Sequence, residues 1–219
     1  MNRPIESNEV LSILTAYPGL SLKPSRGPSI VFEGTLWFDA SYREVNVRDS
    51  FSLELEVPAD FPSSPPVVKE IGGRIPKHED FHVNPDGSLC LGSDVAIKEG
   101  LHEQPTLLDF IDGFVVGFLL NASMKLEHGG PFITGELPHG RLGLISDYQE
   151  RFGLKTEEEV HSALTMLSLK KRVANRQLCP CGCNRRLGKC TLHHTLNKYR
   201  RLAPRSWFAR QAAMVRDSE

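Results

Sequence analysis

The sequence lacks the long apolar runs of membrane-spanning and secreted proteins. Only five of its 219 residues are cysteine, and no stretch approaches the ~18 uninterrupted apolar residues of a membrane span. The first eight residues, MNRPIESN, lack the apolar run of a signal peptide. No glycine-rich nucleotide loop or adenylation motif is visible. We therefore expect a cytoplasmic protein that does not itself activate a substrate with a nucleotide.

The few cysteines are unevenly distributed. Four of them fall within residues 179–190, whereas Cys90 stands alone. This pattern is a poor disulfide framework, but it suits reduced thiolates on a metal ion together with one reactive thiol. The hydrophobic content of 40% is enough for one core of about 150 residues and a smaller appendage. We therefore expect one main domain, which contains Cys90, and a small cysteine-bearing module.

Charge is also unevenly distributed, although the formal net charge is only -1. Residues 1–169 hold 13 Lys/Arg against 25 Asp/Glu, a net of -12, and residues 170–219 hold 13 against 2, a net of +11. A basic tail of this kind indicates an acidic partner. Three partners fit equally well: nucleic acid, an acidic protein face, or the acidic domain of the chain itself.

Hydrophobic periodicity predicts both helices and strands. Phe51, Leu53, Leu55 and Val57 alternate with polar residues, which predicts a strand with one solvent-exposed face and antiparallel neighbours. Thr106 is a candidate helix N-cap, and the carboxylates that follow Thr156, at residues 157–159, suit a helix N-terminus. The predicted helices are 6–17, 107–120, 142–152 and 156–170; the predicted strands are 30–38, 51–57 and 67–71; and 75–103 is predicted to be a long functional loop.

Three motifs in this order carry a family resemblance. They are residues 60–68 (DFPSSPPVV), residues 82–91 (HVNPDGSLCL) and residues 104–108 (QPTLL). Together they resemble the ubiquitin-conjugating enzyme family across residues 5–155. The stretch 130–140 (GPFITGELPHG) is similar to the prokaryotic branch of that family, which occurs in bacterial ubiquitin-like and CBASS antiphage operons. The resemblance implies an α+β fold of the ubiquitin-conjugating (UBC-like) type, in which helices flank an antiparallel sheet.

The same resemblance implies a chemistry for the lone cysteine. Cys90 would carry the C-terminus of a protein as a thioester and transfer it to an amine or another protein acceptor. Asn84 would support the loop or donate a hydrogen bond to the oxyanion. Val83 replaces the middle proline of the family motif, and the nearest acidic residue downstream of Cys90 is Asp94. The implied partners are an activating enzyme or other thioester donor, a ubiquitin-like protein or cGAS/DncV-like nucleotidyltransferase, and an acceptor protein.

Two histidines accompany this motif. His82 is a candidate general base, but a loop histidine that hydrogen-bonds to backbone is the preferred interpretation. His139 lies in a Pro-His-Gly turn, and it would be the partner of Cys90 if the chain were a thiol protease. A non-catalytic binding module with the same fold is another alternative, which the presence of Cys90 disfavours.

The C-terminal cysteines resemble the small zinc-binding SEC-C motif. Cys179, Cys181 and Cys190 are the first three predicted ligands of a structural zinc ion, and Cys183, His193 and His194 are the candidates for the fourth. The site has no expected catalytic role, and docking to a protein is favoured over binding to nucleic acid. The predicted organisation is a catalytic domain at 1–155, a helical linker at 156–175 and a basic zinc module at 176–219.

Overall fold

The computed structural model describes residues 5–25, 27–135 and 140–216, which form two compact units, Met1–Glu136 and Leu137–Glu219. The division falls before the predicted domain end at residue 155. Helix α5 (Gly140–Phe152) contacts α6 (Glu157–Ser168) and α9 (Arg205–Arg216), and it therefore belongs to the second unit. The predicted linker at 156–175 contains α6, in which Val160, Ala163 and Leu164 are fully buried. This segment is therefore part of the core of the second unit.

The first unit is built on one antiparallel sheet with the strand order β1-β2-β3-β4. Its long strands pair throughout, with Leu36 opposite Phe51. Phe51, Leu53, Leu55 and Val57 are buried, which confirms the alternation predicted for this segment. The strands are β1 (Leu20–Lys23), β2 (Ile30–Tyr42), β3 (Val45–Val57) and β4 (Val67–Glu70).

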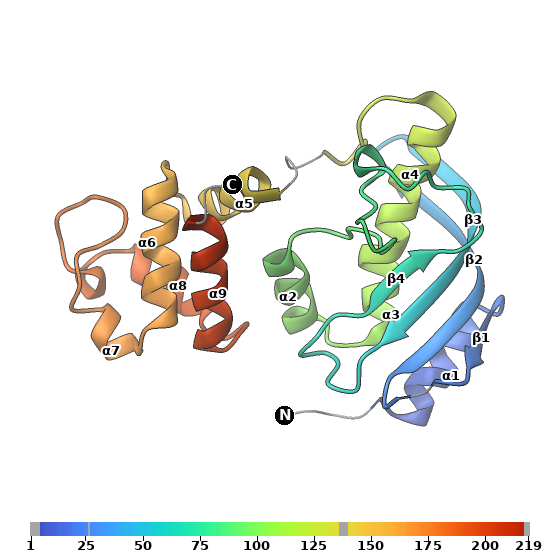
Figure 1. Ribbon diagram of the computed structural model, residues 1–219, viewed down its shortest axis with the longest axis horizontal. Coiled ribbons are helices and arrows are strands. Elements are labelled where there is room, and N and C mark those ends of the chain that lie inside the picture. The colour runs from blue at the N-terminus through green and yellow to red at the C-terminus, as the bar shows by residue number, and fades with distance from the viewer. Residues whose placement is uncertain (1–4, 26, 136–139, 217–219) are drawn as a thin grey trace. The chain divides into compact units, whose positions relative to one another are not determined.

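One continuous helical segment packs along a face of this curved sheet (Figure 1). Thr106 caps its N-terminus by accepting a hydrogen bond from the Asp109 amide at 3.1 Å, as predicted. The span Leu107–His128 is long and apolar enough to cross a membrane, but 56% of its most apolar window is buried inside the protein. It is the core helix of the first unit. Its successive parts are α3 (Leu107–Phe110), the π-helical η2 (Ile111–Val115) and α4 (Val116–His128).

Further short helices complete the first unit. Helix α1 (Ser7–Ala16) contacts α3, and Ile13 buries its apolar side in the core. The region 75–103, predicted to be a loop, contains the short 3-10 helix η1 (Glu79–Phe81) and α2 (Asp94–Glu103). Ser93 caps α2 by accepting from the Ala96 amide at 3.2 Å. Helix α2 therefore begins only four residues after Cys90.

The second unit consists of helices and a cysteine-containing loop. Thr156 and Glu159 form a complete capping box at the start of α6, where the sequence predicted that a helix begins. The other end of α6 is capped by Arg200, whose guanidinium donates to the carbonyls of Met166, Leu167 and Leu169 at 2.6, 3.1 and 2.8 Å. The remaining elements are α7 (Lys171–Ala174), the 3-10 helix η3 (Leu187–Lys189) and α8 (Leu192–Tyr199), and α6 contacts α7, α8 and α9.

Candidate functional site

Cys90 lies at the end of a tight turn that is held against strand β4. The Asn84 amide donates to the Ser88 carbonyl at 2.8 Å, and the Gly87 amide donates to the Asn84 carbonyl at 2.8 Å. The Leu89 amide donates to the Val68 carbonyl at 2.8 Å, and the buried Leu89 side chain anchors the segment in the core. The Cys90 side chain is exposed. The turn therefore presents its thiol to solvent on a backbone fixed from both sides.

A small polar network stabilises the same turn. The Asn84 side-chain amide donates to Ser88 Oγ at 3.0 Å, and Ser88 Oγ donates to Asp86 Oδ1 at 2.7 Å. These contacts lower the pKa of Asp86, mainly through the hydrogen bond from the Ser88 side chain. The sequence alone assigned no role to Ser88 and Asp86. The Ser88 amide donates to Asp86 Oδ1 at 3.0 Å, and such a bond from the backbone amide two residues on is a recurrent turn pattern for Asp. Asn84 thus supports the turn directly.

His82 lies beside Cys90 through its backbone rather than through its ring. The Cys90 amide donates to the His82 carbonyl at 2.7 Å, and His82 has the left-handed backbone conformation, with φ of 52°. Its Nε2 atom is buried, and its ring centroid lies 4.6 Å from that of Phe132. This placement suits a histidine that shapes the loop, and proton transfer by His82 stays a prediction. His139 lies outside the described residues.

The segment that follows α4 supports this histidine. Asn121, on α4, donates from Nδ2 to Thr134 Oγ1 at 2.9 Å and accepts from the Thr134 amide at 3.1 Å. These bonds hold the GPFIT stretch against the core helix and place Phe132 on His82. Sequence reasoning linked this stretch to a family branch, but it gave no structural role for Asn121.

Two lysines fix the elements on either side of Cys90. Lys98, on α2, donates to the Ser63 carbonyl in the proline-rich segment at 2.9 Å. Lys125, on α4, donates to the Asp80 carbonyl at 2.6 Å, and its Nζ lies 5.5 Å from the Phe132 ring centroid. Both bonds tie exposed backbone to the helical scaffold. The thiol is therefore displayed by a supported surface rather than by an isolated loop.

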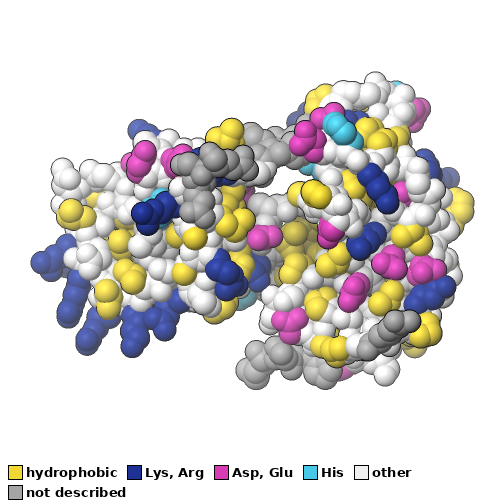
Figure 2. Space-filling view, viewed as in Figure 1, with side chains coloured by type: hydrophobic (Ala, Val, Ile, Leu, Met, Phe, Trp, Pro, Cys, Tyr) yellow, Lys and Arg dark blue, Asp and Glu magenta, His cyan; other side chains and the backbone are white. Residues whose placement is uncertain are grey.

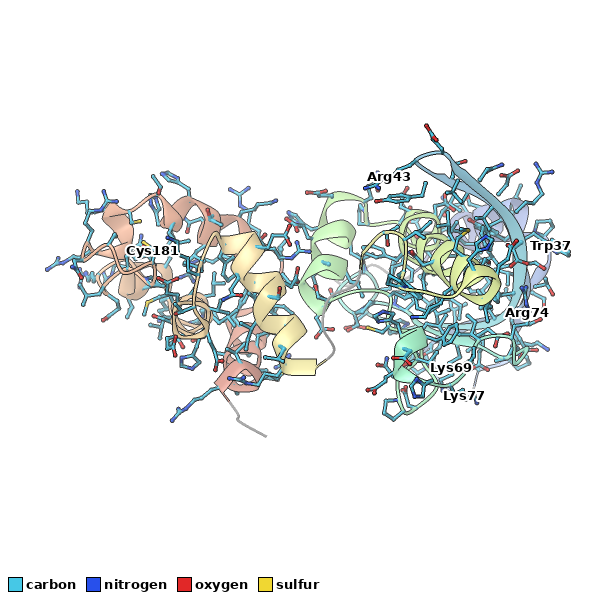
Figure 3. The ribbon with its side chains drawn as sticks, turned by 90° about the horizontal axis from the view of Figure 1, so that it is seen from above. Trp37, Arg43, Lys69, Arg74, Lys77 and Cys181 are labelled. Atoms are coloured by element: carbon cyan, nitrogen blue, oxygen red, sulfur yellow. The ribbon has the colours of Figure 1, made fainter. Side chains whose placement is uncertain are left out.

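The second cluster of chemistry lies in the C-terminal unit, where four cysteine sulfurs converge. The Sγ atoms of Cys179, Cys181, Cys183 and Cys190 all lie within 4.8 Å of one another, and Figure 3 shows Cys181 inside this loop. The Cys179–Cys181 and Cys181–Cys190 separations are 3.3 and 3.7 Å. A tetrahedral ion with metal–sulfur bonds of about 2.3 Å requires sulfur separations of about 3.8 Å. The cluster could therefore bind a metal ion such as zinc.

The loop brings these sulfurs together by pairing its two arms. The Cys179 amide donates to the Arg185 carbonyl at 2.8 Å, and Leu178 forms an isolated antiparallel bridge with Arg186. Asn184, at the turn, has a left-handed backbone conformation, with φ of 57°. The reversal places Cys183 opposite Cys179 and Cys181, and η3 then returns the chain to Cys190.

Cys183, and not a histidine, completes the sulfur cluster. His193 Nδ1 lies 2.7 Å from the Cys190 carbonyl oxygen, so that its ring contacts the backbone of a predicted ligand. The ring centroids of His193 and His194 lie 3.8 Å apart, and the two rings are tilted by 41° to each other. Among the residues that the structure describes, the candidate metal-binding group contains neither histidine. Of the three candidates for the fourth ligand, the geometry therefore favours Cys183.

The surroundings raise the pKa of two of the four thiols and lower the pKa of the other two. Burial raises the pKa of Cys179 and of Cys181. Hydrogen bonds from the Arg185 backbone and side chain lower the pKa of Cys183 to about 6, and a hydrogen bond from the Leu192 backbone lowers that of Cys190. A bound cation would displace the protons that burial retains, because the thiolate is the metal ligand.

In comparisons with known proteins, no family model matches this chain, and no curated protein is a significant match.

Proposed function

We propose that the first unit carries an acyl group as a thioester on Cys90, in the manner of the ubiquitin-conjugating enzymes that its motifs resemble. The observation that carries this proposal is the exposed thiol on a fixed turn, with its amide bonded to His82 and Leu89 buried beside it. An exposed sulfur can be reached by the C-terminus of another protein. A thiolate is a good nucleophile, and the resulting thioester stays reactive towards an amine.

The architecture supports this proposal at the level of element order. An N-terminal helix, three strands, a proline-rich segment, the fourth strand of the antiparallel sheet, a cysteine-bearing turn, helix α2 and a long core helix follow one another along the chain. This order matches the expectation from the motifs, and we extend it to the UBC-like fold itself. In that fold, the turn at residues 84–90 is the active-site turn.

The proposed reaction has two balanced steps. The Cys90 thiolate first attacks the carbonyl carbon of a donor thioester, so that a new C–S bond forms and the thiolate of the activating enzyme leaves. An acceptor amine then attacks the carbonyl carbon of the Cys90 thioester. The C–N bond forms, the Cys90 C–S bond breaks with the electron pair on sulfur, and the amine loses a proton to solvent or a nearby base.

The partners follow from this chemistry and from the family resemblance. We propose an activating enzyme that supplies the thioester, and a donor that is a ubiquitin-like protein or a cGAS/DncV-like nucleotidyltransferase, as in antiphage operons. The acceptor is an amine or another protein. The reaction suits the cytoplasm, where thiols are kept reduced.

The metal ion has a structural role in this proposal. The four cysteines of the second unit would all be occupied as ligands of zinc, and a catalytic zinc site instead keeps an open coordination position. Bound zinc would hold the loop at residues 179–190 closed, in a segment too short to form a core of its own.

The test is to trap the donor. Replacing Cys90 with serine converts a labile thioester into a more stable ester, so we expect an intact-mass increase after co-expression of Cys90→Ser with the genes that neighbour this one. Cys90→Ala provides the matched control and should remain unmodified. An adduct of the same mass on Cys90→Ala would mean that another residue accepts the donor.

A further inference from the structure

The second unit has a long segment with charge of a single sign. Between Glu159 and Asp217 the chain contains 13 Lys/Arg and no Asp or Glu. In the part of this unit that the structure describes, ion pairs join Arg141 to Glu157 and Arg151 to Asp147, and these four residues lie outside that segment. The positive charge is therefore not neutralised by neighbouring carboxylates along the chain.

Local pairing gathers part of this charge onto one surface. The Leu187 amide donates to the Gln177 carbonyl at 2.9 Å, and the Gly188 amide donates to the Asn175 carbonyl at 3.1 Å. A Cβ atom at Gly188 would lie 3.1 Å from the Asn175 carbonyl oxygen, so a larger residue would require Asn175 to shift by a few tenths of an ångström. The end of α7 is thereby fixed against η3 and the cysteine loop.

The basic residues on these segments are solvent-exposed. Figure 2 shows Lys and Arg side chains gathered along the edge of the second unit formed by α7 and the cysteine loop. We call this region the basic edge, and its exposed members are Lys170, Lys171, Arg172, Arg176, Arg185, Arg186 and Lys189. The cysteine cluster lies directly beneath Arg185, whose guanidinium is 4.0 Å from Cys190 Sγ. The basic residues therefore lie on hydrogen-bonded, folded segments rather than on an extended tail.

The composition of the basic edge points to a repeating anion. Four of its seven charges are arginines, which bind phosphate oxygens in a bidentate manner. The exposed side-chain amides of Gln177 and Asn184 add donors of the kind that contact phosphate and sugar. The exposed large apolar side chains in this region are Val173 and Leu178. Two such residues are too few for the apolar centre of a stable protein interface.

We propose that the basic edge binds the phosphate backbone of nucleic acid without reading its sequence. This inference uses no property of Cys90, so it stands or falls separately from the thioester chemistry. In this proposal the cysteine cluster has a structural role, because closing the loop fixes the spacing of the arginines next to the cysteines.

The experiment measures binding of a short, mixed-sequence, fluorescently labelled DNA duplex to the full zinc-loaded chain over a range of salt concentrations. We expect binding at low salt that weakens as salt rises, with a logarithmic slope of about -0.9 for each phosphate contacted. The triple variant Arg176→Gln, Arg186→Gln and Lys189→Gln removes three charges from the basic edge. Its slope should be smaller in magnitude by about 2.7 if each removed side chain contacts one phosphate.

Two further variants make this result specific. Arg205→Gln, Arg210→Gln and Arg216→Gln remove three exposed charges from α9 and give the same net charge as the first variant. We expect this control to keep most of the original slope. Arg176→Lys with Arg186→Lys keeps the charge of the basic edge, and its slope should also be retained. Zinc content and circular dichroism of each variant verify that the fold is intact.

Three results would overturn the proposal. The first is the absence of duplex binding at low salt. The second is an equal decrease of the salt-dependence slope in the α9 control, which would show that binding depends on the net charge of the chain and not on the basic edge. The third is displacement of the duplex by poly-glutamate as effectively as by unlabelled duplex, which would identify an acidic protein surface as the better partner.

Discussion

The two units use the same amino acid in opposite ways. In the first unit, which has 10 Lys/Arg against 20 Asp/Glu, one cysteine is displayed alone on a turn anchored in a sheet. In the second, with 16 against 7, four cysteines converge on one another in a loop beside helices. The difference shows that the surroundings decide what a thiol does. An exposed, isolated sulfur is available to a protein substrate, whereas sulfurs within 4.8 Å of one another are available to a metal ion.

Removing one sulfur from the cluster should have a large effect that is confined to the second unit. For Cys183→Ser we expect zinc affinity to fall by about 100-fold or more, because one of four thiolate ligands is lost. Competition with a chromogenic chelator measures this affinity. Hydrogen exchange should become faster at residues 177–190, while exchange in α6 and in the first unit stays unchanged.

The histidines next to the cluster provide the matched control for Cys183. His193→Ala and His194→Ala should each keep one zinc ion per chain, because neither ring belongs to the sulfur cluster. Full zinc binding by Cys183→Ser together with its loss in either histidine variant would reverse the ligand assignment made here.

The turn beneath Cys90 allows loop support to be separated from oxyanion stabilisation. Asn84→Ala removes both the bond to Ser88 and an amide donor, and loss of an oxyanion donor typically slows a reaction about 100- to 1000-fold. We expect single-turnover discharge to slow by this factor, with thioester loading preserved. Ser88→Ala removes the support for Asn84 but keeps its amide, so discharge should slow much less.

Two other outcomes would change the role assigned to Asn84. Equal slowing of discharge in Asn84→Ala and Ser88→Ala would make Asn84 a positioning residue. Loss of loading with normal discharge in Asn84→Ala would exclude oxyanion stabilisation altogether.

Arg200 tests whether the second unit depends on a helix cap as well as on a metal. Arg200→Met removes hydrogen bonds to three carbonyls at the end of α6, and we expect a loss of about 2–3 kcal/mol of local stability. Hydrogen exchange of α6 amides measures this loss. The exposed neighbour Arg201 is the control, and Arg201→Met should change stability by less than about 0.5 kcal/mol. Equal effects in the two variants would show that the cap contributes nothing.

A smaller, pH-dependent effect is expected in the first unit. Asp49 accepts from both terminal nitrogens of Arg74 at 2.9 and 3.0 Å and from Ser123 Oγ at 2.7 Å. Desolvation alone would raise the pKa of Asp49, but hydrogen bonds, first among them that from Arg74, lower it below its ordinary value. The stabilisation is therefore present above the unfolded pKa near 3.9 and is lost as pH falls through the lower folded value.

The corresponding variant is Asp49→Asn. At neutral pH we expect it to cost about 1 kcal/mol, since Arg74 is half-exposed and its charge is screened. Its stability should also fall less steeply than that of the unaltered chain between pH 5 and 2 (roughly the range of carboxylate protonation). Hydrogen exchange in β3 and α4 at several pH values measures both effects, and parallel pH profiles would contradict the assignment.

The sequence predicted the elements whose side chains alternate strongly or whose ends have clear caps. The strand at 51–57 and the capped helices beginning after Thr106 and Thr156 are confirmed by burial and by hydrogen bonds. Strand β1 was missed because its four residues, LSLK, form a short edge with little periodicity. Helix α2 was missed because Gly100 and several charged residues interrupt its apolar face.

The sites were predictable only as far as local spacing determines them. The lone Cys90 and the clustered cysteines were visible in the sequence, but the choice of Cys183 over two histidines depends on a reversal at Asn184. Similarly, the contact of His82 with Phe132 joins residues fifty positions apart, and no local sequence pattern predicts it. Long-range packing decided the domain boundary as well, since α5 packs with α6 and α9.

The most direct test of the account is a loading reaction with the full zinc-loaded chain, an activating enzyme, ATP and a ubiquitin-like donor. We predict an adduct that is seen without reductant, that disappears with excess thiol, and that peptide mapping assigns to Cys90. An adduct that resists thiol, or one that maps to the cysteines of the second unit, would contradict the central claim that Cys90 is the acyl carrier.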